Sequence, residues 1–146
     1  MAARLPAGDH GPTPSNLVNV TVADTSRMPW DILHVDQTGA DIPFKPLFSD
    51  PDTGMQVFLI RYRVGFTNIW HSHPCAHGMY VLDGVLHTHE GEYGPGSFVW
   101  FDEGGWMEHG ATAENDCTFL FITNKPFGIC YAGDHEHFYP MDGAGT

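Results

Sequence analysis

Hydrophobic and polar residues alternate with a period of two along Met55–Val64, the clearest pattern in the chain. Successive side chains of a β-strand point to opposite faces, so this pattern predicts a strand with one apolar face. That face carries Phe58, Ile60, Tyr62 and Val64, and the other carries Val57, Leu59, Arg61 and Arg63. We expect the first set in a core and both arginines on a solvated face, because charged side chains are seldom buried. The alternative is that one arginine anchors an anionic substrate inside the fold.

Further short apolar segments follow at a spacing of about ten residues, as in β-sandwiches and barrels. Turn sequences such as Asp83-Gly84 and Gly94-Pro95-Gly96 separate them. The predicted strands are Phe44–Leu47, Phe66–His73, Gly78–Leu82, Val85–His89, Ser97–Phe101, Met107–Ala111, Thr118–Thr123 and Phe127–Tyr131. No long helical pattern occurs, so the predicted fold class is all-β, with two antiparallel sheets closing into a sandwich or barrel.

The 146 residues fit one domain. Residues 1–25 have no hydrophobic period, and we interpret them as a flexible arm or as an edge strand lent to a neighbouring subunit. Residues 26–140 would form the domain, and residues 141–146 would be disordered. A Pro-rich arm beside an antiparallel fold, whose edge strands need covering, favours a homo-oligomer, most simply a homodimer.

The chain is acidic, with a net charge of −12 and only six lysines and arginines. This charge argues against nucleic acid or an anionic membrane surface as a partner. The three cysteines have no metal-type spacing, which favours free thiols in a cytoplasmic protein. Cys75 lies between two histidines, so a thiolate ligand is conceivable, but a small apolar packing role is the better interpretation.

The segment between Gly65 and Gly84 carries the chemistry, in His71, His73, His77 and the glycines that flank them. His71 and His73 are two residues apart, so on a strand they point to the same face. His77 lies beyond Pro74 and returns to that face only if the chain turns or bulges. His109 follows downstream of the Pro95-Gly96 turn. Imidazoles at this spacing can converge on one divalent metal ion.

Other polar residues are weaker candidates. His87 and His89 share a strand face and either line a pocket or point to solvent. Glu90 and Glu92 could supply a carboxylate to the metal, although a solvated turn is the better interpretation. Asp134-His135-Glu136-His137 could bind metal adventitiously, but a near-terminal polar loop is more often plain surface. Trp70 should point away from the metal, and Met107 toward it, because neighbours along a strand alternate faces.

The histidine spacing resembles the two motifs of the cupin superfamily, in which two histidines and a glutamate occupy the positions of His71, His73 and His77. A further histidine, after a Pro-Gly turn, corresponds to His109. Longer segments resemble the 2,4'-dihydroxyacetophenone dioxygenase-like cupins and, more loosely, the ChrR-type cupin domains: Phe44–Leu47, Gly54–Tyr62, His71–Pro74, His77–Gly84 and Tyr93–Phe98. His77 departs from the superfamily pattern, because glutamate is expected there.

This resemblance implies a cupin β-barrel (jelly roll) with one divalent metal per chain held by His71, His73 and His109. His77 would be a fourth ligand, a hydrogen-bonding neighbour of the ligands, or a catalytic acid or base. The implied activity is that of a non-haem Fe(II) dioxygenase, which uses O2 to cleave a C–C bond next to a carbonyl. Zn, Ni, Cu or Mn are the other candidate metals.

The expected substrate is a small anionic or enolisable chelator, such as an aryl ketone or β-diketone, because neutral imidazoles leave the charge of the ion to exogenous ligands. Two other functions remain open. One is an O2-independent metal-dependent isomerase, decarboxylase or lyase. The other is a non-enzymatic module that senses a metal or ligand.

Overall fold

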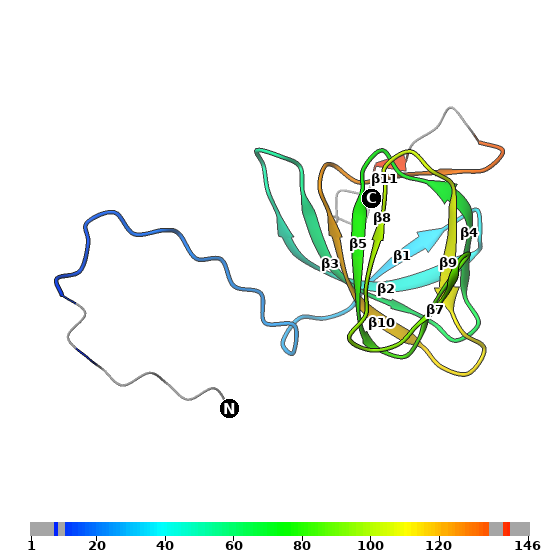
Figure 1. Cartoon of the computed structure of the whole chain (residues 1–146), viewed down its shortest axis with the longest axis horizontal. Helices are drawn as coiled ribbons and strands as arrows, with labels where there is room; N and C mark the ends of the chain where they lie inside the picture. The colour runs from blue at the N-terminus through cyan, green and yellow to red at the C-terminus, as the bar shows by residue number, and fades with distance from the viewer. Residues whose placement is uncertain (1–7, 9–10, 135–138, 141–146) are drawn as a thin grey trace.

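In the computed structural model of the protein, the described residues form two six-stranded antiparallel sheets, which residues 11–30 precede (Figure 1). The structure describes residue 8, residues 11–134 and residues 139–140. The strands are β1 (Asp31–Val35), β2 (Ala40–Ser49), β3 (Gln56–Tyr62), β4 (Thr67–Ser72), β5 (His77–Asp83), β6 (Leu86–Thr88), β7 (Gly91–Tyr93), β8 (Phe98–Phe101), β9 (Met107–Ala111), β10 (Cys117–Thr123), β11 (Gly128–Tyr131) and β12 (Tyr139–Pro140).

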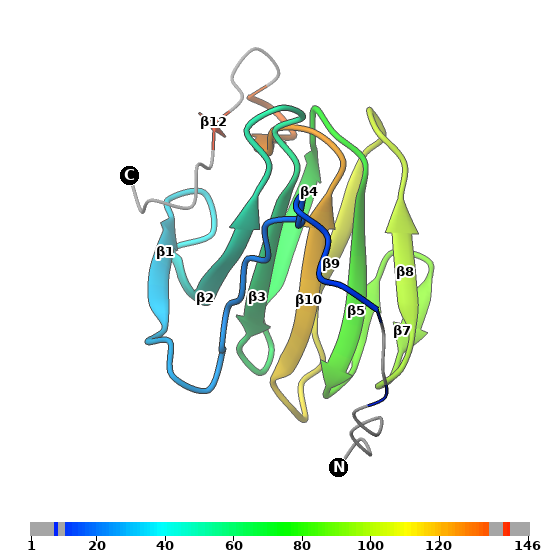
Figure 2. The same ribbon diagram turned by 90° about the vertical axis from the view of Figure 1, so that its left-hand side faces the viewer.

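Sheet A has the strand order β1-β2-β3-β10-β5-β8, and sheet B has the order β12-β11-β4-β9-β6-β7. Figure 2 shows sheet A face-on, with its strands side by side in that order. The described residues contain no helix. The predicted all-β fold of two antiparallel sheets is therefore confirmed.

The core lies between the two sheets and is built from alternate residues of facing strands. Phe58, Met79 and Phe119 contribute from sheet A, and Leu86 and Met107 contribute from sheet B. All five are at most 5% exposed. Burying such large apolar side chains supplies most of the free energy that favours folding.

The alternation along β3 is only partly as predicted. Phe58 and Tyr62 are buried, but Val64 lies beyond the end of β3 and is 51% exposed. The opposite face is not fully solvated either, because the Trp30 ring covers Arg61 at 4.5 Å and Leu59 is only 9% exposed. Arg61 donates a hydrogen bond to Thr118, on the outside of sheet A, so it does not reach the interior. The alternation of residues along β3 did not predict that the Trp30 ring covers Arg61.

Three strands were missed by the sequence pattern. The first, β1, is paired only with β2, and β7 is a three-residue strand where we expected a turn around Glu92. The third, β12, has two residues. All are short edge strands, which carry little periodic signal. The predicted disordered segment 141–146 lies outside the described residues, as do residues 1–7 and 9–10 of the predicted arm.

Gly84 shows why the first motif ends in glycine. Its φ is +78°, a left-handed conformation that residues with a side chain rarely adopt. A Cβ at this position would also collide with the Asp116 carbonyl. The turn between β5 and β6, which carries the chain from sheet A to sheet B, therefore requires glycine.

Candidate metal centre

Three histidines, on or directly after strands of sheet B, converge inside the sandwich. His71 lies on β4, His73 follows directly after β4, and His109 lies on β9. The two strands are neighbours, with Asn68 opposite His109 and Met107 opposite His71. Gly110 lets β9 approach closely here, because a Cβ would collide with the Phe66 carbonyl. Strand pairing thus brings together residues that are far apart in sequence.

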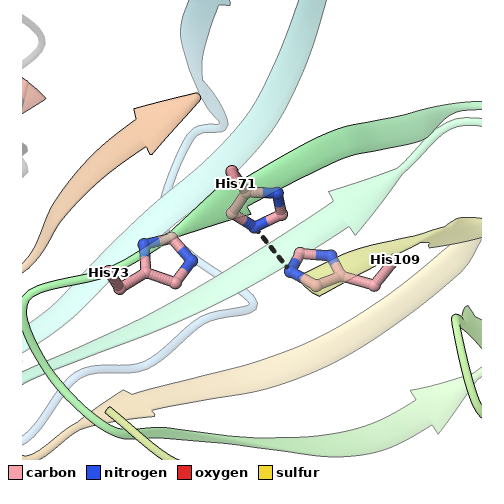
Figure 3. Close-up of side chains that lie close together, drawn as sticks. All are labelled: His71, His73 and His109. Carbon is pink, nitrogen blue, oxygen red and sulfur yellow. Dashed lines mark hydrogen bonds between the residues drawn. The ribbon is translucent and has the colours of Figure 1, made fainter. Parts of the chain in front are cut away.

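The ligand atoms of these three side chains face one another (Figure 3). One ring nitrogen from each of His71, His73 and His109 lies within 4.8 Å of the others. The Nε2 atoms of His71 and His109 are only 3.1 Å apart. All three side chains are at most 2% exposed. The cluster is therefore compact and shielded from solvent.

The outer nitrogen of each ring is held by the protein. His71 Nδ1 donates to the Ile69 carbonyl at 2.6 Å, and His73 Nδ1 donates to the Gly128 carbonyl at 2.7 Å. A carbonyl only accepts hydrogen bonds, so both rings carry their proton on Nδ1 and present a lone pair on Nε2. His109 Nδ1 lies 3.1 Å from the Tyr62 hydroxyl. Such outer hydrogen bonds orient histidines that bind metal ions.

This arrangement fits a divalent cation. The Nε2 lone pairs of His71 and His73 point into the cluster, and His109 can do the same by donating its Nδ1 proton to Tyr62. No carboxylate belongs to the cluster among the residues that the structure describes. Imidazole nitrogens suit Zn, Cu, Fe and Ni, so the donor set does not choose among them.

Burial keeps these imidazoles neutral, which metal binding requires. Desolvation lowers the pKa of His71 to about 4. The pKa of His73 and that of His109 are lowered well below the usual value, first by desolvation and then by the neighbouring histidines. Each of these imidazoles is therefore neutral at neutral pH and has one ring nitrogen that carries no proton and can bind a metal ion.

His77 reaches the centre from the opposite sheet. It is the first residue of β5, in sheet A, and its ring centroid lies 4.8 Å from that of His73. The ring stacks on Phe101 at 4.7 Å and is 0% exposed. Neither of its nitrogens has a hydrogen-bond partner among the described residues. His77 is not part of the group of three whose ligand atoms lie within 4.8 Å, so it adjoins that group.

The weaker candidates lie elsewhere. Glu90 and Glu92 are exposed, and His87 Nδ1 lies 3.4 Å from a Glu92 oxygen outside the sandwich. The His89 ring contacts Trp70, which is 46% exposed and so points away from the centre as predicted. The exposed carboxylates of Glu90 and Glu92 therefore do not approach the histidine cluster.

Cys75 is a free, fully buried thiol, and burial raises its pKa to about 11. It is not in the ligand group, so the packing role fits better than a thiolate ligand. Residues 135–137 lie outside the described residues.

A cleft of about 360 Å³ opens where both sheets end, between β8 and the strands β7, β6 and β9. Thr88, Phe101 and Met107 line its inner part. Each is next to the centre: Thr88 is opposite His109, Met107 is opposite His71, and the Phe101 ring lies 5.5 Å from that of His109. Trp106, Tyr93 and Glu90 line it farther out. The inner end of the cleft is therefore formed by residues that adjoin the histidines.

Sequence reasoning missed the groups that orient the three histidines. Tyr62 was expected only to fill the core, and the carbonyls of Ile69 and Gly128 leave no trace in residue type. The Tyr131 hydroxyl donates to Asn68 at 2.7 Å, next to the histidines. Apart from the bond between His71 and Ile69, which lies within β4, these contacts join separate segments of the chain, so only the pairing of the strands reveals them.

The family model of the ChrR cupin-like domain matches residues 18–128. The chain belongs to this cupin family. A comparison with curated proteins found no significant match. In the described part of the chain, no helix is long and apolar enough to cross a membrane.

Several solved structures share the fold. An RmlC-like cupin protein from Ralstonia eutropha JMP134 is 19% identical, with a TM-score of 0.69, over 84% of this chain and 80% of that one. An acetylacetone dioxygenase from Acinetobacter johnsonii is 10% identical, with a TM-score of 0.66, over 91% and 92%. A chain of the Rhodobacter sphaeroides complex of SigE with the anti-sigma ChrR is 18% identical, with a TM-score of 0.56, over 68% and 51%. At these identities the similarity shows the cupin fold alone.

Proposed function

We propose that this cupin is a metal-dependent dioxygenase that cleaves a C–C bond next to a carbonyl in an aryl ketone or β-diketone. The observation that carries the proposal is the group of three buried, neutral imidazoles, with no carboxylate among them in the described part of the chain. The fold shared with an acetylacetone dioxygenase supports it. The same fold serves many chemistries, so the activity depends on the residues of the site.

His71, His73 and His109 would hold one divalent ion, with Fe(II) favoured. Bound there, the ion would act as a Lewis acid toward a chelating carbonyl compound and bring O2 to it. Because all three ligands are neutral, the two positive charges of the ion are left for exogenous ligands. The centre therefore favours an enolate that binds through two oxygens.

His77 would be the fourth ligand. Its ring faces the group from sheet A, and its two nitrogens are buried without a partner among the described residues. A buried polar group without a hydrogen bond costs roughly 1–3 kcal/mol, so the arrangement would be costly if His77 had no ligand to bind. If His77 ligates only the substrate-free ion, it would be free to take the enol proton when the chelator displaces it. In either role it acts on the reacting atoms.

The surrounding aromatic side chains would exclude water. Phe101 and Phe121 contact the His77 ring, and the Phe127 ring lies 4.7 Å from that of His73. A dry site strengthens the attraction between the ion and an anionic chelator. The cleft bounded by Phe101 and Met107 would admit the part of the substrate that does not chelate.

The test is anaerobic loading with Fe(II), followed by oxygen-electrode screening of β-diketones and aryl hydroxyketones. A β-diketone and one O2 balance to one carboxylic acid and one 2-oxoaldehyde, so O2 uptake and acid should appear in equal amounts. The His109→Ala variant should show no uptake, and His87→Ala, which removes a histidine outside the sandwich, should match the wild type. Absence of uptake by protein that binds both Fe(II) and the diketone would refute the dioxygenase.

The same assay identifies the two rival functions. Metal-dependent turnover without O2 would indicate an isomerase, decarboxylase or lyase. The family relationship to ChrR makes a sensing module the second candidate. Ligand or metal binding without turnover of any tested compound would favour that module.

A further inference from the structure

The outer face of sheet A is apolar on three adjacent strands, where an antiparallel sheet in contact with water would be polar. Strand register defines two rows of side chains that cross β10, β5 and β8. In one row Leu120 is opposite Tyr80, which is opposite Phe98. In the other, Ile122 and Trp100 flank Gly78. We call the bare face the set Tyr80, Leu82, Phe98, Trp100, Leu120 and Ile122.

Exposure of this bare face is substantial. Tyr80, Leu82, Phe98 and Trp100 are 40%, 49%, 57% and 49% exposed. None of the outward-facing residues of β5 and β8 between Gly78 and Leu82 or between Phe98 and Trp100 is charged. Large contiguous apolar patches are uncommon on monomers and mark interaction surfaces.

The neighbouring half of the same sheet is covered by the chain itself. The Trp30 ring lies 4.5 Å from Lys45 Nζ and from Arg61 Cζ, and Lys45 donates to the Thr25 carbonyl at 2.7 Å. These contacts cover β2 and β3, so Lys45 is only 8% exposed and Leu59 only 9%. The part of the outer face that the chain itself covers ends at β3. The bare face begins on the next strand, β10.

The arm that leads to Trp30 carries apolar side chains that are largely exposed. Leu17, Val18, Val20 and Val22 are 68–83% exposed. The three valines are two residues apart, so they share one side of an extended chain. The arm has no strand in residues 11–30. Figure 1 shows it running away from the sandwich on the side of sheet A, and Figure 2 shows it passing in front of that sheet.

We propose that the bare face is the interface of a homodimer, and that residues 17–22 of each chain pack against the bare face of the other. The bare face and residues 17–22 are two exposed apolar surfaces on the same side of one sheet. A two-fold axis between two chains would bury both surfaces at once. The arm is fixed by Trp30 at the border of the bare face, so it enters the interface directly. At about 3.3 Å per residue, the segment from Trp30 back to Val22 spans roughly 26 Å. Three strand spacings are only about 14 Å, so the arm is long enough to cross the face.

The test is light scattering of the full-length protein at micromolar concentration, with and without metal. The wild type should have twice the 16.2 kDa mass of the chain. Leu82→Glu places a charge in the bare face and should weaken dimerisation about tenfold or more, because each interface receives two buried charges. Val64→Glu is the matched control, since Val64 is 51% exposed and lies outside the face. It should leave the dimer intact.

Deletion of residues 1–22 tests the arm without touching the folded sheets. We expect roughly threefold to tenfold weaker dimerisation for it, and a similar loss for Val20→Glu. Circular dichroism verifies that Leu82→Glu is folded, and if it is not, Phe98→Ser tests the same face in its place. A wild-type monomer, or a dimer insensitive to substitution in the bare face, would overturn the proposed interface. A dimer sensitive to that substitution but not to deletion of the arm would overturn the role of residues 17–22.

Discussion

The two sheets supply different kinds of histidine to the same centre. The three from sheet B each have their outer nitrogen held by a backbone carbonyl or by Tyr62. His77, from sheet A, is equally buried, yet both its nitrogens lack a partner in the described part of the chain. The difference shows that the fold itself orients His71, His73 and His109, which we call the trio. We expect His77 to acquire a polar partner from something that enters the centre.

Removal of one trio member should have the largest effect. His71→Ala should abolish stabilisation by added metal, because an ion bound only to the folded state adds its binding free energy to folding. For the wild type this gain is about 2.7 kcal/mol at a metal concentration roughly one hundred times the dissociation constant. Thermal unfolding with and without Zn2+ measures it, with His87→Ala as control. An equal metal-induced shift in His71→Ala would remove His71 from the ligand set.

Acidification should lower the free energy of unfolding of the metal-free protein by nearly as much. The pKa of His71 is about 4 and that of His77 about 3 in the folded state, both lowered by burial from 6.5. Below pH 6.5 the unfolded chain takes up protons that the folded chain excludes, so stability falls as the pH falls toward these lowered values. Each such histidine contributes about 1.4 kcal/mol per pH unit. Urea unfolding between neutral pH and about pH 5 measures the slope, and a flat profile would contradict buried neutral imidazoles.

The same substitution at His77 and at His109 should separate the two kinds of histidine. His77→Phe should stabilise the metal-free protein by about 1–3 kcal/mol, because it removes two unpartnered nitrogens from a pocket already lined by Phe101 and Phe121. His109→Phe should destabilise it, since the Tyr62 hydroxyl loses its hydrogen bond to the His109 ring. Urea midpoints of the metal-free variants provide the comparison. A destabilised His77→Phe protein would mean that His77 already has a structural role.

His77→Glu should have the smallest effect. Glutamate is also a competent metal ligand, so metal should still bind. The added negative charge should weaken the binding of a diketonate by about tenfold. Metal content and diketonate affinity are measured at equal metal loading for both proteins. Unchanged or tighter diketonate binding would place His77 beyond the electrostatic reach of the ion.

Much of this arrangement could be predicted from local patterns. The two-residue spacing of His71 and His73 implied a shared face, and alternating segments predicted β3, β4 and β9 within one or two residues of their ends. Strand pairing could not be predicted in the same way. It alone places His77 on the sheet opposite the trio, and it brings Tyr62 to His109. The covering of Arg61 by Trp30 also depends on the path of the arm, which no periodicity records.

The central claim is that one divalent ion is held by His71, His73 and His109. Elemental analysis after anaerobic loading and removal of excess metal tests it most directly. We predict about one ion per chain for the wild type and for His87→Ala, since neither loses a member of the trio. His71→Ala and His109→Ala should retain almost none. Full metal retention in both of these variants would contradict the claim.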